Sequence, residues 1–216
     1  MAGDVISFTL LAISSVLIII NPLGATLIYV SLTTSLDRSS RNVIARDACR
    51  FALLILLFVA VLGAWILQLF GISLEAFRIA GGILLFGIGM EMVYAKTSRT
   101  KLTATEKYES RETDDVAIMP IAIPMIAGPG AITTAIVLMN EAIPLSPVAI
   151  GVVFLSIILS ILITYYIMLN SDYIMSKIGQ REYRAINRLM GMLLIAIAVQ
   201  FVLTGIRTAF PLLAGG

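Results

Sequence analysis

The chain has 216 residues, of which 59% are hydrophobic and only 13% are charged. A soluble globular domain is about 45–50% apolar and about 25% charged, and a chain of this length has no core large enough to bury the excess. The composition therefore excludes an ordinary soluble domain and indicates an integral membrane protein. Histidine is absent and Cys49 is the single cysteine, which excludes histidine-dependent catalytic triads, the usual zinc sites and a disulfide within the chain.

Six apolar stretches are long enough to cross a hydrocarbon core, which takes about 20 helical residues. In chain order they are Val5–Leu36, Phe51–Phe70, Leu74–Ala95, Val116–Met139, Val148–Leu169 and Leu189–Ala209. The first stretch lacks the basic leading segment and the cleavage site of a signal peptide, so we expect the mature protein to retain it. The predicted fold is all-α, with six transmembrane helices.

Basic residues are concentrated in alternate connections between these stretches. The loops after the first, third and fifth stretches hold thirteen of the fifteen lysines and arginines, and the connections after the second and fourth hold none. The positive-inside rule places the three basic loops in the cytoplasm and both termini outside. Residues 96–115, with five basic and five acidic side chains, are expected to form a solvated cytoplasmic linker.

Two unusual motifs of the first half recur in the second half. Asn21–Thr26 matches Gly128–Thr133, with prolines 107 residues apart, and Arg78–Leu85 matches Arg188–Ile195, 110 residues later. Each half holds three spans, an odd number, so a repeated second half is inverted relative to the first, as in many transporters. We therefore predict two inverted three-helix repeats, residues 1–95 and 116–216, joined by the linker 96–115.

Proline and glycine predict that the first and fourth helices are broken. The first stretch is too long for one straight crossing, and Pro22 and Gly24 lie in its middle. The fourth stretch holds its prolines and glycines even more densely, around Gly128. Two half-helices would then begin near the membrane midplane and run in opposite directions, so that their positive N-terminal ends converge. The alternative is that these prolines only kink packed helices.

Converging helix N-termini bind small anions or carboxylates through free backbone amides. Gly24 and Gly130 would let the backbone approach a ligand closely, while Asn21 and Thr133 would add side-chain contacts. No catalytic residue or metal ligand is expected. The candidate substrate-binding residues are Asn21, Leu23, Gly24, Ala25, Thr26, Gly128, Gly130, Ala131, Ile132 and Thr133.

These motifs resemble the MarC family of prokaryotic inner-membrane proteins. The resemblance spans nearly the whole chain, and its most specific part is the proline- and glycine-rich string. The motifs that carry it are Asn21-Pro22, the string 120–132 (PIAIPMIAGPGAI), Gly71-Ile72-Ser73, Arg78-Ile79-Ala80-Gly81-Gly82, Arg188-Leu189-Met190-Gly191 and Val199-Gln200-Phe201. The family includes small neutral amino acid transporters called SnatA, which carry glycine and alanine.

The resemblance implies a secondary transporter of small neutral amino acids in the cell inner membrane, with H⁺ or Na⁺ as the expected coupling ion. A zwitterion fits the predicted site, because helix N-termini offer donors to its carboxylate and unwound carbonyls, Asn21 and threonines offer acceptors to its ammonium. No cofactor and no nucleic-acid partner is expected. The alternatives are a passive channel and an exporter of another small solute. A membrane enzyme is disfavoured, since the spans hold no nucleophile–base pair.

Overall fold

The computed structural model describes residues 2–94, 117–177 and 179–210. All regular structure in these ranges is helical, which confirms the all-α prediction, while the predicted linker 96–115 lies outside the described residues. The helices are α1 (Ala2–Ile20), α2 (Pro22–Thr33), α3 (Arg38–Leu69), α4 (Leu74–Tyr94), the π-helix η1 (Ala117–Ile126), α7 (Pro129–Leu145), α8 (Pro147–Leu169), α9 (Ser171–Lys177) and α10 (Gln180–Ala209).

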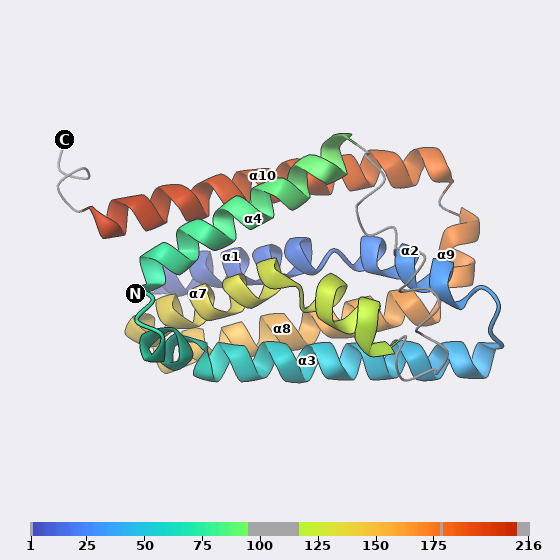
Figure 1. The fold of residues 1–216 in the computed structure, drawn as a ribbon, viewed down its shortest axis with the longest axis horizontal. Helices are drawn as coiled ribbons and strands as arrows, with labels where there is room; N and C mark the ends of the chain where they lie inside the picture. Colours follow the sequence, from blue (N-terminus) through green and yellow to red (C-terminus); the bar gives the residue numbers. More distant parts are fainter. Residues whose placement is uncertain (1, 95–116, 178, 211–216) are drawn as a thin grey trace.

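The long helices cross the molecule in alternating directions, so the start of α1 and the end of α10 lie at the same end of the bundle (Figure 1). Helices α4 and α10 form a closely packed pair along one side. Helices α1 and α7 lie under this pair, and α3 and α8 pack on the opposite side of them. The segments that connect α2 to α3 and α8 to α10 lie at the other end of the bundle.

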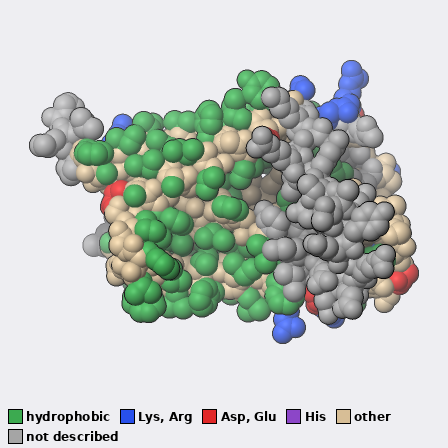
Figure 2. Space-filling model, in the orientation of Figure 1, with side chains coloured by type: hydrophobic (Ala, Val, Ile, Leu, Met, Phe, Trp, Pro, Cys, Tyr) green, Lys and Arg blue, Asp and Glu red, His purple; other side chains and the backbone are tan. Residues whose placement is uncertain are grey.

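Among the described residues, five helical segments are long and apolar enough to cross a membrane, and they identify a multi-pass membrane protein. The fourth predicted span is not among them, because it divides into η1 and the 17-residue helix α7. Large apolar side chains point outward from the bundle, including Phe58 (55% exposed) and Trp65 (63% exposed) on α3. Figure 2 shows such side chains covering the middle of one face, as a lipid-facing surface requires.

Two predicted loops are helical instead. Helix α3 begins at Arg38, so the basic residues expected in the first cytoplasmic loop lie on its first turns. Asp37 starts this helix, because its carboxylate accepts hydrogen bonds from the amides of Ser39 (3.0 Å) and Ser40 (3.3 Å). The predicted loop before the sixth span likewise holds α9 and the first turns of α10. Hydropathy located the apolar parts of these helices and missed the polar turns that continue them.

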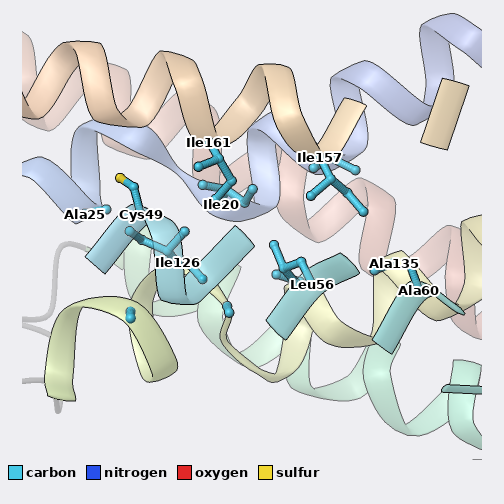
Figure 3. Close-up of a cluster of buried hydrophobic side chains, with 14 of the residues drawn as sticks. Ile20, Ala25, Cys49, Leu56, Ala60, Ile126, Ala135, Ile157 and Ile161 are labelled. Carbon is cyan, nitrogen blue, oxygen red and sulfur yellow. The ribbon is translucent and has the colours of Figure 1, made fainter. Parts of the chain in front are cut away.

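The main core joins six of the helices in one cluster of buried side chains. Ile20 ends α1 and Ile126 ends η1, and both are fully buried in this cluster beside Leu56 and Ile157 (Figure 3). Alanines on α3 and α7 let the backbones approach there. Because Ile20 and Ile126 immediately precede the two interruptions of the chain, both interruptions lie in the interior of the bundle.

Glycines hold α4 and α10 together. A Cβ atom on Gly82 would lie 2.8 Å from the carbonyl oxygen of Ala198, and one on Gly89 would lie 2.9 Å from that of Gly191. These glycines therefore allow the backbones of α4 and α10 to approach closely. Gly87 is the exception, because a Cβ there would meet no atom within 4 Å.

Candidate functional site

The first interruption is a single residue. Asn21 adopts a left-handed conformation (φ 49°, ψ 68°), and it is the one non-glycine residue with positive φ among the described residues. Asparagine tolerates this region better than most residues. Its Oδ1 accepts a hydrogen bond from the amide of Gly24 (3.2 Å), and Pro22 opens α2. The predicted break is therefore present, and the Asn21 side chain caps the new helix.

The second interruption comprises Ala127 and Gly128, between η1 and α7. Helix α7 opens on Pro129 with Gly128 as its N-cap, and no side chain caps its first amides. The prolines of η1 would clash with carbonyls four residues earlier in an α-helix. The turns of η1 are of the wider π type, as in the hydrogen bond from the Ala127 amide to the Ala122 carbonyl (2.8 Å). The two half-helices thus differ: α2 is capped by its own side chain, and α7 is not.

One face of α4 passes both interruptions. A Cβ atom on Gly130 would collide with the Leu85 side chain and lie 3.6 Å from Ile19. The Met92 sulfur lies 4.0 Å from Nδ2 of Asn21. Leu85 and Met92 are seven residues apart, so they share one face of α4 and lie about 10 Å apart along its axis. The two interruptions therefore approach the same helix at neighbouring positions.

Threonines stand at equivalent places in the two half-helices. Thr26 donates a hydrogen bond to the Pro22 carbonyl (2.7 Å), and Thr133 donates one to the Pro129 carbonyl (2.9 Å). The neighbouring hydroxyl of Thr134 is buried without a hydrogen-bond partner among the described residues. A buried hydroxyl left unpaired costs about 1–3 kcal/mol, so Thr134 marks a place where a ligand or water would be stabilising.

The predicted site residues lie at the interruptions and on the first turns of the two half-helices α2 and α7, and most of them are packed. Leu23 and Ile132 are partly exposed. The buried members are Gly24, Ala25, Thr26, Gly128, Gly130, Ala131 and Thr133. Sequence reasoning missed Leu85 and Met92, although their seven-residue spacing on α4 was visible. Gln200 lies elsewhere, on the exposed surface of α10, where it donates a hydrogen bond to Thr204 (3.1 Å).

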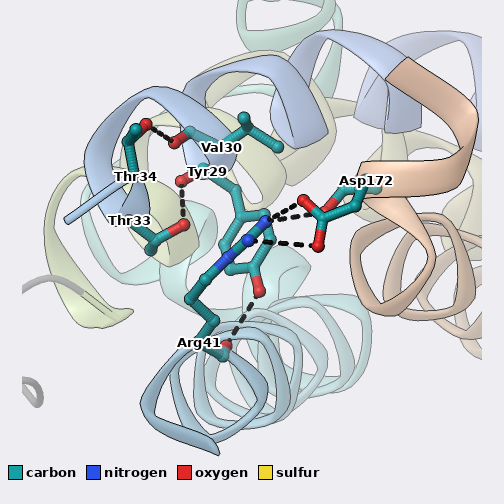
Figure 4. A network of polar contacts seen from close by, with 7 residues as sticks. Tyr29, Val30, Thr33, Thr34, Arg41 and Asp172 are labelled. Carbon is teal, nitrogen blue, oxygen red and sulfur yellow. Dashed lines mark hydrogen bonds and ion pairs between the residues drawn. The ribbon is translucent and has the colours of Figure 1, made fainter. Parts of the chain in front are cut away.

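Two ion pairs link the halves of the chain at opposite ends of the bundle. At the end where α4 begins, Nη2 of the buried Arg78 lies 2.8 Å from a carboxylate oxygen of Glu141. Arg78 is thus buried against α7. At the other end, Arg41 contacts both carboxylate oxygens of Asp172 (2.9 and 3.2 Å) and lies over the Tyr29 ring (Figure 4).

The interruptions offer polar groups without charge. None of the side chains described above at or next to the interruptions (Ile19, Asn21, Leu85, Met92, Thr133 and Thr134) is ionisable. The first turn of α7 offers the positive end of a helix dipole. This arrangement can hold a small solute that carries both a carboxylate and an ammonium group. It gives no support to a charged side chain as the principal binding group.

The chain is similar to a family of membrane proteins over almost its full length. Residues 6–210 match the family model described as MarC family integral membrane protein. A UPF0056 membrane protein of Methanocaldococcus jannaschii is 42% identical over 94% of this chain and 98% of its own length. YvbG of Bacillus subtilis is 36% identical (96% and 98%), and YhcE of Escherichia coli is 34% identical (89% and 89%). No solved structure matches the chain.

Proposed function

Because the chain belongs to the MarC family of integral membrane proteins, we propose that it is a secondary transporter of small neutral amino acids such as glycine and alanine. The substrate binds between the interruptions at Asn21 and Gly128, and an H⁺ or Na⁺ gradient drives its movement. The observation that carries this proposal is the uncapped N-terminus of α7 beside the unpaired hydroxyl of Thr134. Together they offer donors to a carboxylate and one acceptor to an ammonium group.

The side chains around the site favour a small substrate. Leu85 fills the space in front of Gly130, and Thr133 occupies the space beside Gly81, so that a Cβ on either glycine would collide with these side chains. Glycine and alanine need little room beyond their charged groups. A larger side chain would require Leu85 to move away, which gives the site a steric selection for size.

Matched packing supports two inverted three-helix repeats of six spans in total. Helix α1 packs against α8 as η1 packs against α3, and α2 packs against α8 as α7 packs against α3. The pairs α3–α8 and α4–α10 each join corresponding spans of the two halves. Exchange of the halves about a pseudo-two-fold axis therefore relates these contacts to one another, and it relates the threonine hydrogen bond of α2 to that of α7. The extensive contacts of α7 with α4 and α8 have no counterpart of similar extent at α2.

We place the protein in the cell membrane with both termini outside. The basic turns at the starts of α3 and α10 lie at one end of the bundle, which the positive-inside rule assigns to the cytoplasm. The Arg41–Asp172 pair then lies near the inner surface and the Arg78–Glu141 pair near the outer surface. Each pair joins one half of the chain to the other. Their alternate opening would expose the site first to one side and then to the other.

Binding of labelled glycine to the purified protein tests the proposal. We expect saturable binding, and we expect Thr134→Val to weaken it roughly two- to tenfold through loss of one hydrogen bond. The same substitution removes an unpaired buried hydroxyl, so the melting temperature should stay equal or rise. Thr34→Val is the matched control, because the exposed Thr34 hydroxyl bonds the Val30 carbonyl far from the site.

Two results would count against the proposal in different ways. No binding of glycine or alanine by the wild-type protein contradicts the substrate class and favours the alternative of a channel or exporter for another solute. Wild-type affinity in Thr134→Val places the substrate away from α7, whatever the substrate is.

A further inference from the structure

A separate cavity of about 80 Å³ lies where α4 begins and α10 ends. Leu74, Glu75 and Arg78 line it from the first turns of α4, and Thr208 lines it from the last turn of α10. Arg78 is seven residues from Leu85, which packs at Gly130, so the cavity lies about 10 Å along α4 from the central site. A single water needs about 10–15 Å³ of such volume, so this cavity has room for the few non-hydrogen atoms of a small amino acid.

Arg78 presents an unused donor in this cavity wall. The residue is only 6% exposed, and its Nη2 donates to Glu141. Its Nε–H group is buried with no hydrogen-bond partner among the residues that the structure describes. A guanidinium group has five N–H donors and can hold two carboxylates at once. Because Arg78 lines the cavity, a carboxylate bound there would meet its guanidinium group, which keeps N–H donors beyond the one paired with Glu141.

Acceptors for a cation face the same space. Glu75 is partly exposed and has no ion pair in the described part of the chain, and the Thr208 hydroxyl donates to the Thr204 carbonyl (2.8 Å), which leaves its oxygen able to accept. With Arg78 paired to Glu141, Glu75 carries one uncompensated negative charge. Glu75 and Arg78 lie one turn apart on α4, and the positive end of the α4 dipole and the negative end of the α10 dipole both lie at this end of the bundle. The cavity thus has a cationic and an anionic pole.

We propose that this cavity is a second recognition site, which binds the adjacent carboxylate and ammonium groups of a small zwitterionic amino acid. The carboxylate contacts Arg78 and the start of α4, and the ammonium group contacts Glu75 and Thr208. The choice of an amino acid rests on the proposed function, whereas the two poles come from the cavity alone. In the proposed orientation, the site lies at the outer end of the protein, where a substrate is captured or released.

Equilibrium binding of labelled glycine to the full chain tests this site and the central site separately. We expect two sites per wild-type molecule. Glu75→Gln removes the anionic pole and should weaken one site about tenfold or more, because it replaces a charge-assisted contact with a neutral one. Thr134→Val should weaken the other site and leave the cavity unaffected. Glu182→Gln, the same change at an exposed position at the opposite end of the bundle, should alter neither.

The outcomes of this experiment distinguish failure of the second site from failure of the central site. A single site that responds to Thr134→Val and not to Glu75→Gln overturns the second site and leaves the proposed function intact. A single site that responds only to Glu75→Gln supports the cavity and contradicts the central site. No glycine binding contradicts both. Acetate and ethylamine each carry half of the recognised pattern, and competition by either one as strong as by glycine would overturn the assignment of a zwitterion.

Discussion

Alanine at Gly89 and alanine at Gly87 should have clearly different effects on stability. A Cβ on Gly89 would lie 2.9 Å from the Gly191 carbonyl oxygen and 3.1 Å from the Ile195 amide nitrogen. Backbone atoms cannot rotate out of the way, so α4 and α10 must separate by several tenths of an ångström. Such overpacking costs about 1–3 kcal/mol. A Cβ on Gly87 would meet no atom within 4 Å, so that substitution gains helix propensity without a clash.

The difference between the two variants isolates the clash, because the gain in helix propensity is common to both. A difference of about 1–3 kcal/mol corresponds to roughly 2–12 °C in melting temperature for a chain of this size. Unfolding of the detergent-solubilised protein, followed by the fluorescence of its one tryptophan, Trp65, measures both values. Equal melting temperatures for Gly89→Ala and Gly87→Ala would refute the close packing of α4 against α10.

Glu141→Gln should lower the melting temperature by the equivalent of about 1–3 kcal/mol, which is less than for a fully buried ion pair because water reaches the carboxylate. The double variant Arg78→Met, Glu141→Leu should recover most of this loss, because it removes both charges. A double variant no more stable than Glu141→Gln would contradict the pairing. Asn21→Ala should destabilise the protein more than Asn21→Gly, because glycine adopts the left-handed backbone without strain and is only a few tenths of a kcal/mol worse than asparagine as an N-cap. Equal decreases in melting temperature for the two variants would argue against the positive φ of residue 21. Hydrogen bonds from a serine hydroxyl and amides lower the pKa of Asp37. The stabilisation by the Asp37 carboxylate is therefore fully present above the usual aspartate pKa and is lost as pH falls through the lowered pKa of the folded protein. The wild-type protein should melt at a higher temperature than Asp37→Asn at neutral pH, and this difference should shrink below about pH 4.

The interruptions of the first and fourth spans could be predicted because local chemistry decides them. Pro22 removes a backbone donor wherever the chain folds, and Asn21 both caps a helix and tolerates positive φ. Pro129 repeats the effect of proline in the second half, after Gly128, whose backbone is extended (φ −67°, ψ 172°). Such positions need no knowledge of neighbours in space. The location of the two breaks was therefore readable from the residues themselves.

What surrounds the interruptions depends on tertiary packing, and the sequence did not reveal it. Leu85 lies against Gly130, and Arg78 reaches Glu141, which is 63 residues away along the chain. Neither pairing has a local signal. The extents of α3 and α10 were missed for another reason, since their first turns are polar and hydropathy detects only the part of a helix that suits lipid. The sequence pattern predicted a contact between Asn21 and the substrate, and the structure shows the Asn21 side chain capping α2.

Counterflow in proteoliposomes tests most directly whether this protein is a carrier of small neutral amino acids. Vesicles loaded with unlabelled glycine are diluted into a trace of labelled glycine. A carrier exchanges the two through one alternately exposed site, so we predict a transient accumulation of label above its equilibrium level that Thr134→Val reduces. A channel lets the label equilibrate without any overshoot. Label that enters without an overshoot, or that does not enter at all, would contradict the account.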